Sequence, residues 1–167
     1  VLMGYNEPDK VEQANMPVST AAAMWPRLEV LNMPLLGPAV AGHPATSSWS
    51  MDFMDEVDED EMRVELVGMH SYGGPSANSF INKITSAWNA FGREVVVSEF
   101  SVVDWSDTNS WTKVPVYNFF EEVLWRMEKL PYLNRYAVFI FTNDPSTPIS
   151  DTRGEMREAG GSLTPAG

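Results

Sequence analysis

Residues 94–100, EVVVSEF, decide the fold class of this chain. Three consecutive valines between Glu94 and Ser98 predict a short strand that is buried on both faces, with Glu99 directly after it. Amphipathic helices are predicted before and after this strand, because apolar side chains recur there every three or four residues, at 80–91 and at 116–127. Doubly buried strands that alternate with helices are typical of a parallel sheet with helices outside it.

The same alternation extends to both ends of the chain. Strands are predicted at 1–6, 35–41, 64–69, 94–98 and 136–141. Four helices are predicted between them: one at 19–32, one that begins after Ser48 as N-cap, one at 80–91 and one at 116–127. Pro26 should kink the first helix, and Gly92 should end the third. A closed eight-stranded barrel needs at least ~200 residues, and this chain has 167. The five strands therefore indicate either a small open α/β sheet or part of a barrel.

Composition excludes several classes of function. The chain has 11 Lys and Arg against 23 Asp and Glu, a net charge of −12, which argues against nucleic acids and anionic membranes as partners. It has no Cys, which excludes thiolate metal sites and Cys catalysis, and no apolar run of membrane-spanning length. Composition does not exclude neutral substrates such as sugars. The start at Val1, without an initiator Met or signal peptide, suggests that an N-terminal part is missing.

Chemistry-bearing side chains gather where the predicted strands end. Asn6 and Glu7 follow the first strand, His70 and Tyr72 the third, and Glu99 the fourth. Because the carboxyl ends of parallel strands share one edge, Glu7 and Glu99 suggest a carboxylate pair, as glycoside hydrolysis requires. A solvated loop glutamate is the plainer alternative for each of them taken alone.

Other features have plainer explanations. The acidic run at 52–61 indicates a solvated helix face, with a calcium site as a minor alternative. Helical spacing favours the core for three tryptophans, Trp49, Trp88 and Trp125. Trp105 lies in the polar loop after Glu99, where an aromatic ring either packs or stacks on a sugar face.

An ordered set of short motifs resembles one known family along essentially the whole chain. The motifs are GYNEPD (4–9), QANM (13–16), AAAMWP (21–26), LGPAVA (36–41), MHSYG (69–73), VVSEF (96–100), RYAVF (135–139) and GSLTP (161–165). They are similar to those of the Asl1-like glycosyl hydrolases, glycoside hydrolase family 128. Two positions depart from the family pattern, since Ser71 and Val138 stand where it has Trp. Both changes remove aromatic surface near the expected cleft.

The resemblance implies a (β/α)8 barrel of which this chain supplies strands four to eight. Residues 1–167 would then form a single but partial catalytic domain, expected to be inactive alone. The implied activity is that of a retaining endo-β-1,3-glucanase, with Glu7 as general acid/base and Glu99 as nucleophile. A non-catalytic β-glucan-binding or cell-wall-associated protein on the same fold is the alternative.

The roles of Asn6, His70 and Tyr72 also come from the resemblance, whereas Trp105 is a candidate from its place in the loop after Glu99. Asn6 would bind the sugar 2-hydroxyl, and His70 and Tyr72 would line the floor, with Tyr72 close enough to donate to Glu99. Trp105 is the candidate sugar platform. No metal and no cofactor is expected, because carboxyl groups perform the proton and nucleophile steps. The expected partner is a β-glucan polysaccharide or oligosaccharide, in an extracellular or cell-wall location.

Overall fold

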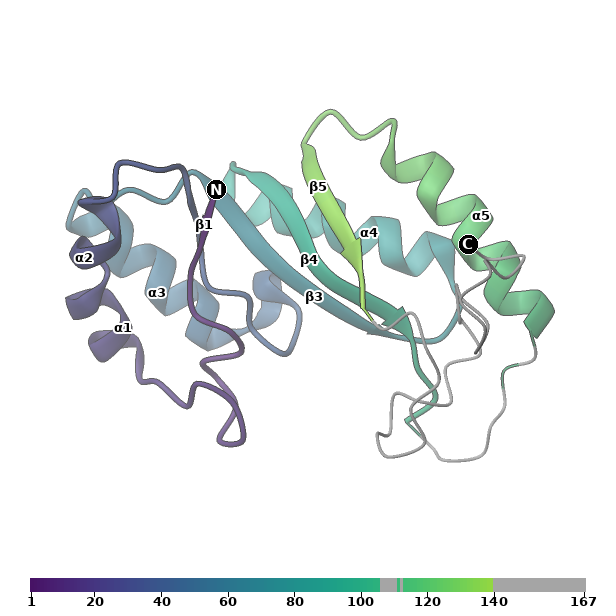
Figure 1. Ribbon diagram of the computed structural model, residues 1–167, viewed down its shortest axis with the longest axis horizontal. Helices are drawn as coiled ribbons and strands as arrows, with labels where there is room; N and C mark the ends of the chain where they lie inside the picture. Colours follow the sequence, from purple (N-terminus) through teal and green to yellow (C-terminus); the bar gives the residue numbers. More distant parts are fainter. Residues whose placement is uncertain (106–110, 112, 140–167) are drawn as a thin grey trace. The chain divides into compact units, whose positions relative to one another are not determined.

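The computed structural model describes residues 1–105, 111 and 113–139 (Figure 1). Five strands alternate with helices along the chain. The elements are β1 (Leu2–Met3), α1 (Val18–Met24), α2 (Pro26–Glu29), β2 (Leu35–Leu36), η1 (Pro44–Thr46), α3 (Ser48–Glu59), β3 (Leu66–Gly73), α4 (Ala77–Phe91), β4 (Glu94–Val102), α5 (Lys113–Met127) and β5 (Leu133–Val138). The strands form one sheet in chain order, β1-β2-β3-β4-β5.

The sheet is parallel, as the buried strands predicted. Leu2 lies opposite Leu35 across β1 and β2, and Leu36 lies opposite Leu66 across β2 and β3. Between the last two strands, Val95 N–H donates to Tyr132 O at the start and Phe139 N–H donates to Phe100 O at the end. Bonds that advance along both chains in the same direction mark a parallel pair. The fold class is therefore α/β, with one five-stranded parallel sheet.

The chain divides into two compact units. Of the described residues, unit 1 contains Val1–His70, Lys83–Ser98 and Pro131–Tyr136, and unit 2 contains Ser71–Asn82, those between 99 and 130, and 137–139. Three strands, β3, β4 and β5, pass from one unit into the other. The predicted site residues divide in the same way, since Glu7 and His70 belong to unit 1 and Tyr72 and Glu99 to unit 2.

The core of unit 1 is built around Trp25, which is fully buried. Its ring packs edge-on against Tyr5 at 5.8 Å and Phe53 at 5.2 Å between centroids, and its indole N–H donates to the Arg63 carbonyl at 2.8 Å. The strand before Glu7 approaches this ring closely. A Cβ on Gly4 would lie 2.8 Å from Leu36 O and 3.0 Å from the Trp25 ring, so only glycine fits there.

The core of unit 2 is an aromatic cluster between β4 and helices α4 and α5. Phe80 lies 4.9 Å from Phe100 and 5.8 Å from Phe119, and Phe100 lies 6.0 Å from Phe120. All four rings are at least 94% buried, because their exposed fractions are 6% or less. Phe100 is the neighbour of Glu99 in the chain, so this packing fixes the backbone that presents that carboxylate.

Several element boundaries differ from the sequence prediction. The chain breaks into two helices at Pro26 rather than bending, because proline donates no hydrogen bond to the preceding turn. The side chain that caps α3 is that of Ser47, one residue before the predicted Ser48. β4 continues through Glu99 to Val102, and β5 begins at Leu133, three residues before the predicted start. The predicted end of that last strand, at residues 140 and 141, lies outside the described residues, as does the loop at 106–110.

Two of the tryptophans assigned to the core are exposed. Trp88 is 39% exposed and stacks on Tyr132 with centroids 4.6 Å apart, and Trp125 is 64% exposed beneath Lys129. Both lie at the solvent-facing margin of an amphipathic helix, where helical spacing does not separate core from rim. In contrast, Gly92 ends α4 with φ +62°, as predicted. None of the described helices combines the length and the apolar character needed to cross a bilayer.

Candidate active site

Glu7 occupies a strained and firmly held backbone position after β1. Its N–H donates to Ala39 O at 2.8 Å, and a parallel bridge joins the preceding Asn6 to Ala39. Its φ is +40°, in the left-handed region that residues with a Cβ rarely adopt. Lys10 N–H then donates to Glu7 O at 3.1 Å and closes the turn. Strain of this kind persists only where the surroundings impose it, and it is concentrated at functional sites.

The Glu7 carboxyl group is buried against a histidine. Glu7 is 7% exposed and His70 is 3% exposed, and Glu7 Oε1 lies 3.0 Å from His70 Nδ1. The side chains come from residues 63 apart in sequence, so the sheet brings them together. Lys10 Nζ stands 3.9 Å from the other carboxyl oxygen, at the limit of an ion pair. A buried carboxyl with one imidazole partner is suited to holding and exchanging a proton.

Tyr5 ties the strand before Glu7 to α1. Its hydroxyl donates to the Ala21 carbonyl at 3.2 Å. Burial raises the pKa of the Tyr5 phenol, against a smaller opposing effect of the positive charge of Arg27. The phenol therefore keeps its proton, and this hydrogen bond, throughout the neutral range.

Asn6, the predicted ligand of the sugar 2-hydroxyl, is exposed in unit 1. Its Nδ2 donates to Gln13 Oε1 at 3.3 Å, a long bond between two exposed side chains. Such a weak contact costs little to exchange for a ligand hydroxyl.

The second glutamate has a different partner. In unit 2, the Tyr72 hydroxyl donates to Glu99 Oε2 at 2.5 Å, across the neighbouring strands β3 and β4. A phenol that donates to a carboxylate forms a short, charge-assisted hydrogen bond that fixes the carboxylate rotamer. Glu99 is thus held in one orientation by an O–H group.

Aromatic rings surround Tyr72. Trp105 is 60% exposed and meets the Tyr72 ring edge-on, with centroids 6.5 Å apart. Phe139 meets the same ring at 5.9 Å and is 37% exposed. Trp105 was a predicted site residue, whereas Phe139 was not, because position 139 lies inside the strand predicted at 136–141 and only the structure ends β5 at Val138.

Within each unit, the structure brings predicted residues together. Glu7 and His70 are in contact in unit 1, and Tyr72, Glu99 and Trp105 are grouped in unit 2. His70 and Tyr72 are two residues apart on β3 and therefore project from the same face of the strand. The roles of all these residues stay predictions.

Ser71, which stands where the resembling family has Trp, lies between His70 and Tyr72. It is 6% exposed, and strand alternation directs it to the opposite face from its two neighbours. This change therefore leaves the face that carries His70 and Tyr72 intact.

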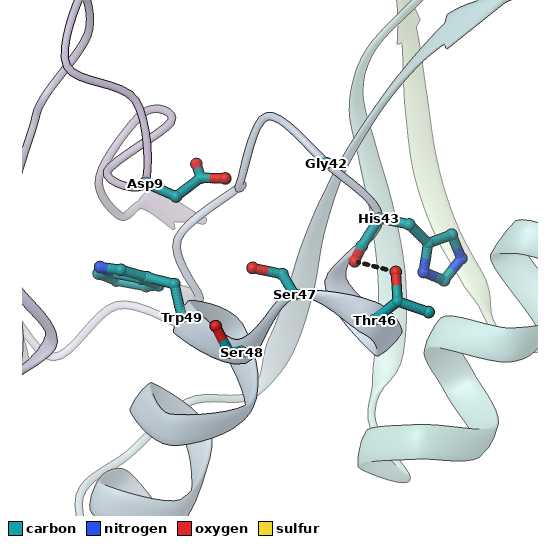
Figure 2. A pocket seen from close by; sticks show the side chains of 7 residues that line it. All are labelled: Asp9, Gly42, His43, Thr46, Ser47, Ser48 and Trp49. Carbon is teal, nitrogen blue, oxygen red and sulfur yellow. Dashed lines mark hydrogen bonds between the residues drawn. The ribbon is translucent and has the colours of Figure 1, made fainter.

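Unit 1 also has an open pocket beside the turn that holds Glu7. It measures about 510 Å³ and is lined by Asp9, by Gly42 and His43, and by residues 46–49 (Figure 2). A smaller cavity of about 50 Å³ is lined by His70, by residues 3–6 and by Leu36, Gly37 and Ala39. Of these two cavities of the described residues, the open pocket is large enough to admit a ligand and the smaller one is not.

Comparisons with known proteins match this chain over its whole length. The family model described as "Glycosyl hydrolase catalytic core" matches residues 1–167. No curated protein matches the chain.

Solved structures give the same result. A GH128 (subgroup I) endo-beta-1,3-glucanase from Amycolatopsis mediterranei, in complex with laminaritriose and laminaribiose, is 26% identical with a TM-score of 0.85, over 99% of this chain and 68% of that chain. A subgroup II endo-beta-1,3-glucanase from Sorangium cellulosum is 23% identical with a TM-score of 0.80, over 99% and 66%. A subgroup VI exo-beta-1,3-glucanase from Aureobasidium namibiae is 20% identical with a TM-score of 0.80, over 98% and 64%. The S. cellulosum and A. namibiae enzymes, below 25% identity, show similarity to this chain in fold alone.

Proposed function

This chain belongs to the glycosyl hydrolase catalytic core family, and on that premise we propose that its enzyme is a retaining endo-β-1,3-glucanase in which Glu7 and Glu99 perform the chemistry. The observation that carries the proposal is that each of the two glutamates has a side chain from β3 within hydrogen-bond distance of its carboxyl group. Glu7 is held by His70, and Glu99 is held by Tyr72.

The environments of the two carboxyl groups support different roles. Glu7 is buried beside an imidazole that can share a proton with it, which suits a general acid/base. Glu99 receives an O–H hydrogen bond at 2.5 Å, which suits a nucleophile that must be ionised and correctly oriented. Two carboxyl groups in unlike surroundings are the usual basis for dividing acid and nucleophile roles.

The proposed reaction has two steps. Glu99 attacks the anomeric carbon of a glucosyl unit while Glu7 gives its proton to the departing glycosidic oxygen, and a covalent glycosyl-enzyme forms. Glu7, now ionised, then removes a proton from water, which attacks the same carbon and releases Glu99. The product keeps the β configuration because the carbon is inverted twice. No metal or organic cofactor takes part in either step.

The neighbouring residues have positioning and binding roles in this proposal. Tyr72 orients Glu99, and His70 orients Glu7. Asn6 binds the 2-hydroxyl of the reacting sugar. The exposed ring of Trp105 stacks on a neighbouring glucosyl unit, since an aromatic face matches the apolar face of glucose.

Relatives support the substrate. The A. mediterranei enzyme, 26% identical to this chain, has been solved with laminaritriose, and a variant of it with a glutamate replaced by alanine has been solved with laminaripentaose. We therefore propose a β-1,3-linked glucan as the substrate. The extracellular or cell-wall location stays a prediction.

The test is hydrolysis of laminarin and laminari-oligosaccharides by the enzyme that contains residues 1–167. We expect release of β-1,3-linked oligosaccharides from internal positions, and loss of this activity in Glu7→Gln and Glu99→Gln. Glu94→Gln is the matched control, because Glu94 lies on the same strand as Glu99 but bonds to the exposed Asn134. Binding of laminari-oligosaccharides without any hydrolysis would favour the alternative, a non-catalytic glucan-binding protein. Full activity in both variants would refute the assigned roles.

A further inference from the structure

The loops that follow β1 and β2 are joined by a short continuation of the parallel hydrogen-bond ladder. Ala39 N–H donates to Tyr5 O at 3.2 Å, and Glu7 N–H donates to Ala39 O at 2.8 Å. In a regular parallel pair, the next bond of this ladder would run from Ala41 N–H to Glu7 O, because donors alternate between the two strands. A backbone N–H at the end of such a ladder needs an acceptor of its own.

The turn at Glu7 removes that acceptor, and the Asp9 side chain replaces it. The positive φ of Glu7, +40°, turns the chain away from the ladder, and Glu7 O accepts from Lys10 N–H at 3.1 Å. Asp9 Oδ1 accepts from Ala41 N–H at 2.9 Å. Figure 2 shows the Asp9 carboxylate pointing toward the loop that runs to Gly42. A short Asp side chain can imitate a backbone carbonyl in this way, so the carboxylate takes the place that Glu7 O has left.

This replacement links Asp9 to the orientation of the Glu7 carboxyl group. A left-handed φ at a residue with a Cβ is unfavourable by itself and persists because its neighbours impose it. Without the Asp9 acceptor, Ala41 N–H is available to Glu7 O, and the φ of Glu7 can relax toward the extended values of an uninterrupted strand. Such a relaxation changes the direction of the side chain and moves the carboxyl group away from His70 Nδ1, which lies 3.0 Å from Glu7 Oε1 in the structure.

We propose that Asp9 is a positioning residue for Glu7, whose carboxylate holds the turn in the conformation that places the Glu7 carboxyl group against His70. Asp9 acts through its hydrogen-bond acceptor, so its negative charge is not required. The inference rests on the proposed function, in which Glu7 gives its proton to the leaving oxygen. Loss of the acceptor therefore slows proton donation and leaves the other steps intact.

Two substitutions separate the acceptor of Asp9 from its charge. Asp9→Ala removes the acceptor, whereas Asp9→Asn keeps an oxygen that accepts and removes the charge. Asp9 is exposed, so neither variant leaves a cavity in the core. Glu29→Ala is the matched control, because the Glu29 carboxylate also accepts from a backbone N–H distant in sequence, that of Arg63 at 2.6 Å. Arg63 precedes the start of β3, whereas His70 lies in the second half of that strand.

Two substrates distinguish proton donation from a general loss of structure. Laminarihexaose needs a proton on its departing oxygen, whereas dinitrophenyl β-laminaribioside releases a phenolate that needs none. The quantity measured is kcat/KM for each substrate, with the enzyme that contains residues 1–167. Thermal unfolding verifies that the variants fold, and hydrogen exchange of the Ala41 and Glu7 amides reports on the turn without depending on activity.

We expect Asp9→Ala to lower kcat/KM for laminarihexaose about 10-fold and to change the value for the aryl glycoside by about twofold or less. Asp9→Asn should stay within about twofold of the unmodified enzyme on both substrates. Glu29→Ala should lower the melting temperature and neither kcat/KM value. Exchange at Ala41 and Glu7 should be faster in Asp9→Ala than in Asp9→Asn.

Three results would overturn the positioning role: an unchanged kcat/KM for laminarihexaose in Asp9→Ala, an equal loss on both substrates, or a loss in Asp9→Asn as large as in Asp9→Ala. Failure of the proposed function gives a different result, since Glu7→Gln would then cleave laminarihexaose as fast as the unmodified enzyme does. In that case, faster amide exchange in Asp9→Ala alone would still show that Asp9 holds the Glu7 turn, and unchanged exchange would overturn this as well.

Discussion

Removing one oxygen atom from Tyr72 tests how much the Tyr72–Glu99 hydrogen bond contributes to catalysis. Tyr72→Phe keeps the ring that packs against Trp105 and Phe139 and deletes only the hydroxyl that donates to Glu99 Oε2 at 2.5 Å. A hydrogen bond to a charged group contributes about 1.5–3 kcal/mol. If Glu99 is the nucleophile, its orientation is lost in the transition state, and kcat/KM for laminarihexaose should fall roughly 10- to 150-fold.

The assay is steady-state hydrolysis of laminarihexaose, with thermal unfolding measured in parallel. Tyr132→Phe is the control, because it also deletes a bonded hydroxyl, the one 2.8 Å from Thr85 Oγ1, and keeps a stacked ring. We expect the control to lose about 1 kcal/mol of stability or less and none of its activity. If Tyr72→Phe retains kcat/KM within about twofold of the unmodified enzyme, the orienting role assigned to this bond is wrong.

Three further predictions concern the same site and its frame. Azide should restore activity to both glutamate variants with opposite products, an α-glycosyl azide from Glu99→Gly and a β-glycosyl azide from Glu7→Ala; exchanged anomers would mean exchanged roles. Trp105→Ala should weaken binding of laminari-oligosaccharides by roughly 1–3 kcal/mol, and a lowered melting temperature with unchanged affinity would make Trp105 a packing residue instead. Burial raises the pKa of Glu65, but the Leu35 N–H at 2.7 Å and Arg63 at 2.9 Å outweigh it and hold this pKa below its ordinary value of 4.5. Because the pKa of Glu65 is lower in the folded than in the unfolded chain, the ionised carboxylate stabilises the fold fully above pH 4.5, and this stabilisation is lost as pH falls further. Urea unfolding of Glu65→Gln should therefore show a smaller loss of stability at acid pH than the unmodified chain, by about 1 kcal/mol or less for an exposed carboxylate. Equal dependence of stability on pH in the two proteins would contradict this.

The sequence was sufficient for the order of elements because the strands differ so clearly from the helices. The run of valines at 95–97 is fully buried or nearly so, as its doubly apolar pattern predicted. The end of that strand was misplaced because Glu99 interrupts the apolar run, and a charged residue in a strand was interpreted as the beginning of a loop. In the structure the strand continues through Phe100 to Val102, since the Phe100 ring fills the core of unit 2.

The partners of the candidate site residues could not be predicted from spacing. Glu7 and His70 are 63 residues apart, and no local pattern specifies that their side chains meet. The positive φ of Glu7 is likewise invisible in the GYNEPD motif, because a glutamate rarely adopts it without tertiary support. The pocket beside Asp9 could not be predicted either, because its lining residues are distant in sequence. Trp49, which lines it, has the spacing of a core residue of an amphipathic helix.

Solvent-exposed aromatic residues show a limit of helical periodicity. Trp88 and Trp125 repeat with the spacing of buried residues, yet both are more than one-third exposed, at 39% and 64%. One face of each ring is covered, that of Trp88 by Tyr132 and that of Trp125 by Lys129. Spacing identifies the side of a helix, but the depth of burial depends on neighbours that are distant in sequence.

The anomeric form of the first product tests the central claim most directly. The enzyme that contains residues 1–167 is mixed with laminarihexaose, and proton NMR spectra are recorded before mutarotation equilibrates the reducing ends. A retaining mechanism through Glu99 predicts that the β-anomer appears first and that the α-anomer grows only at the rate of mutarotation. Initial release of the α-anomer would mean that a single displacement by water takes place and that Glu99 is not a nucleophile.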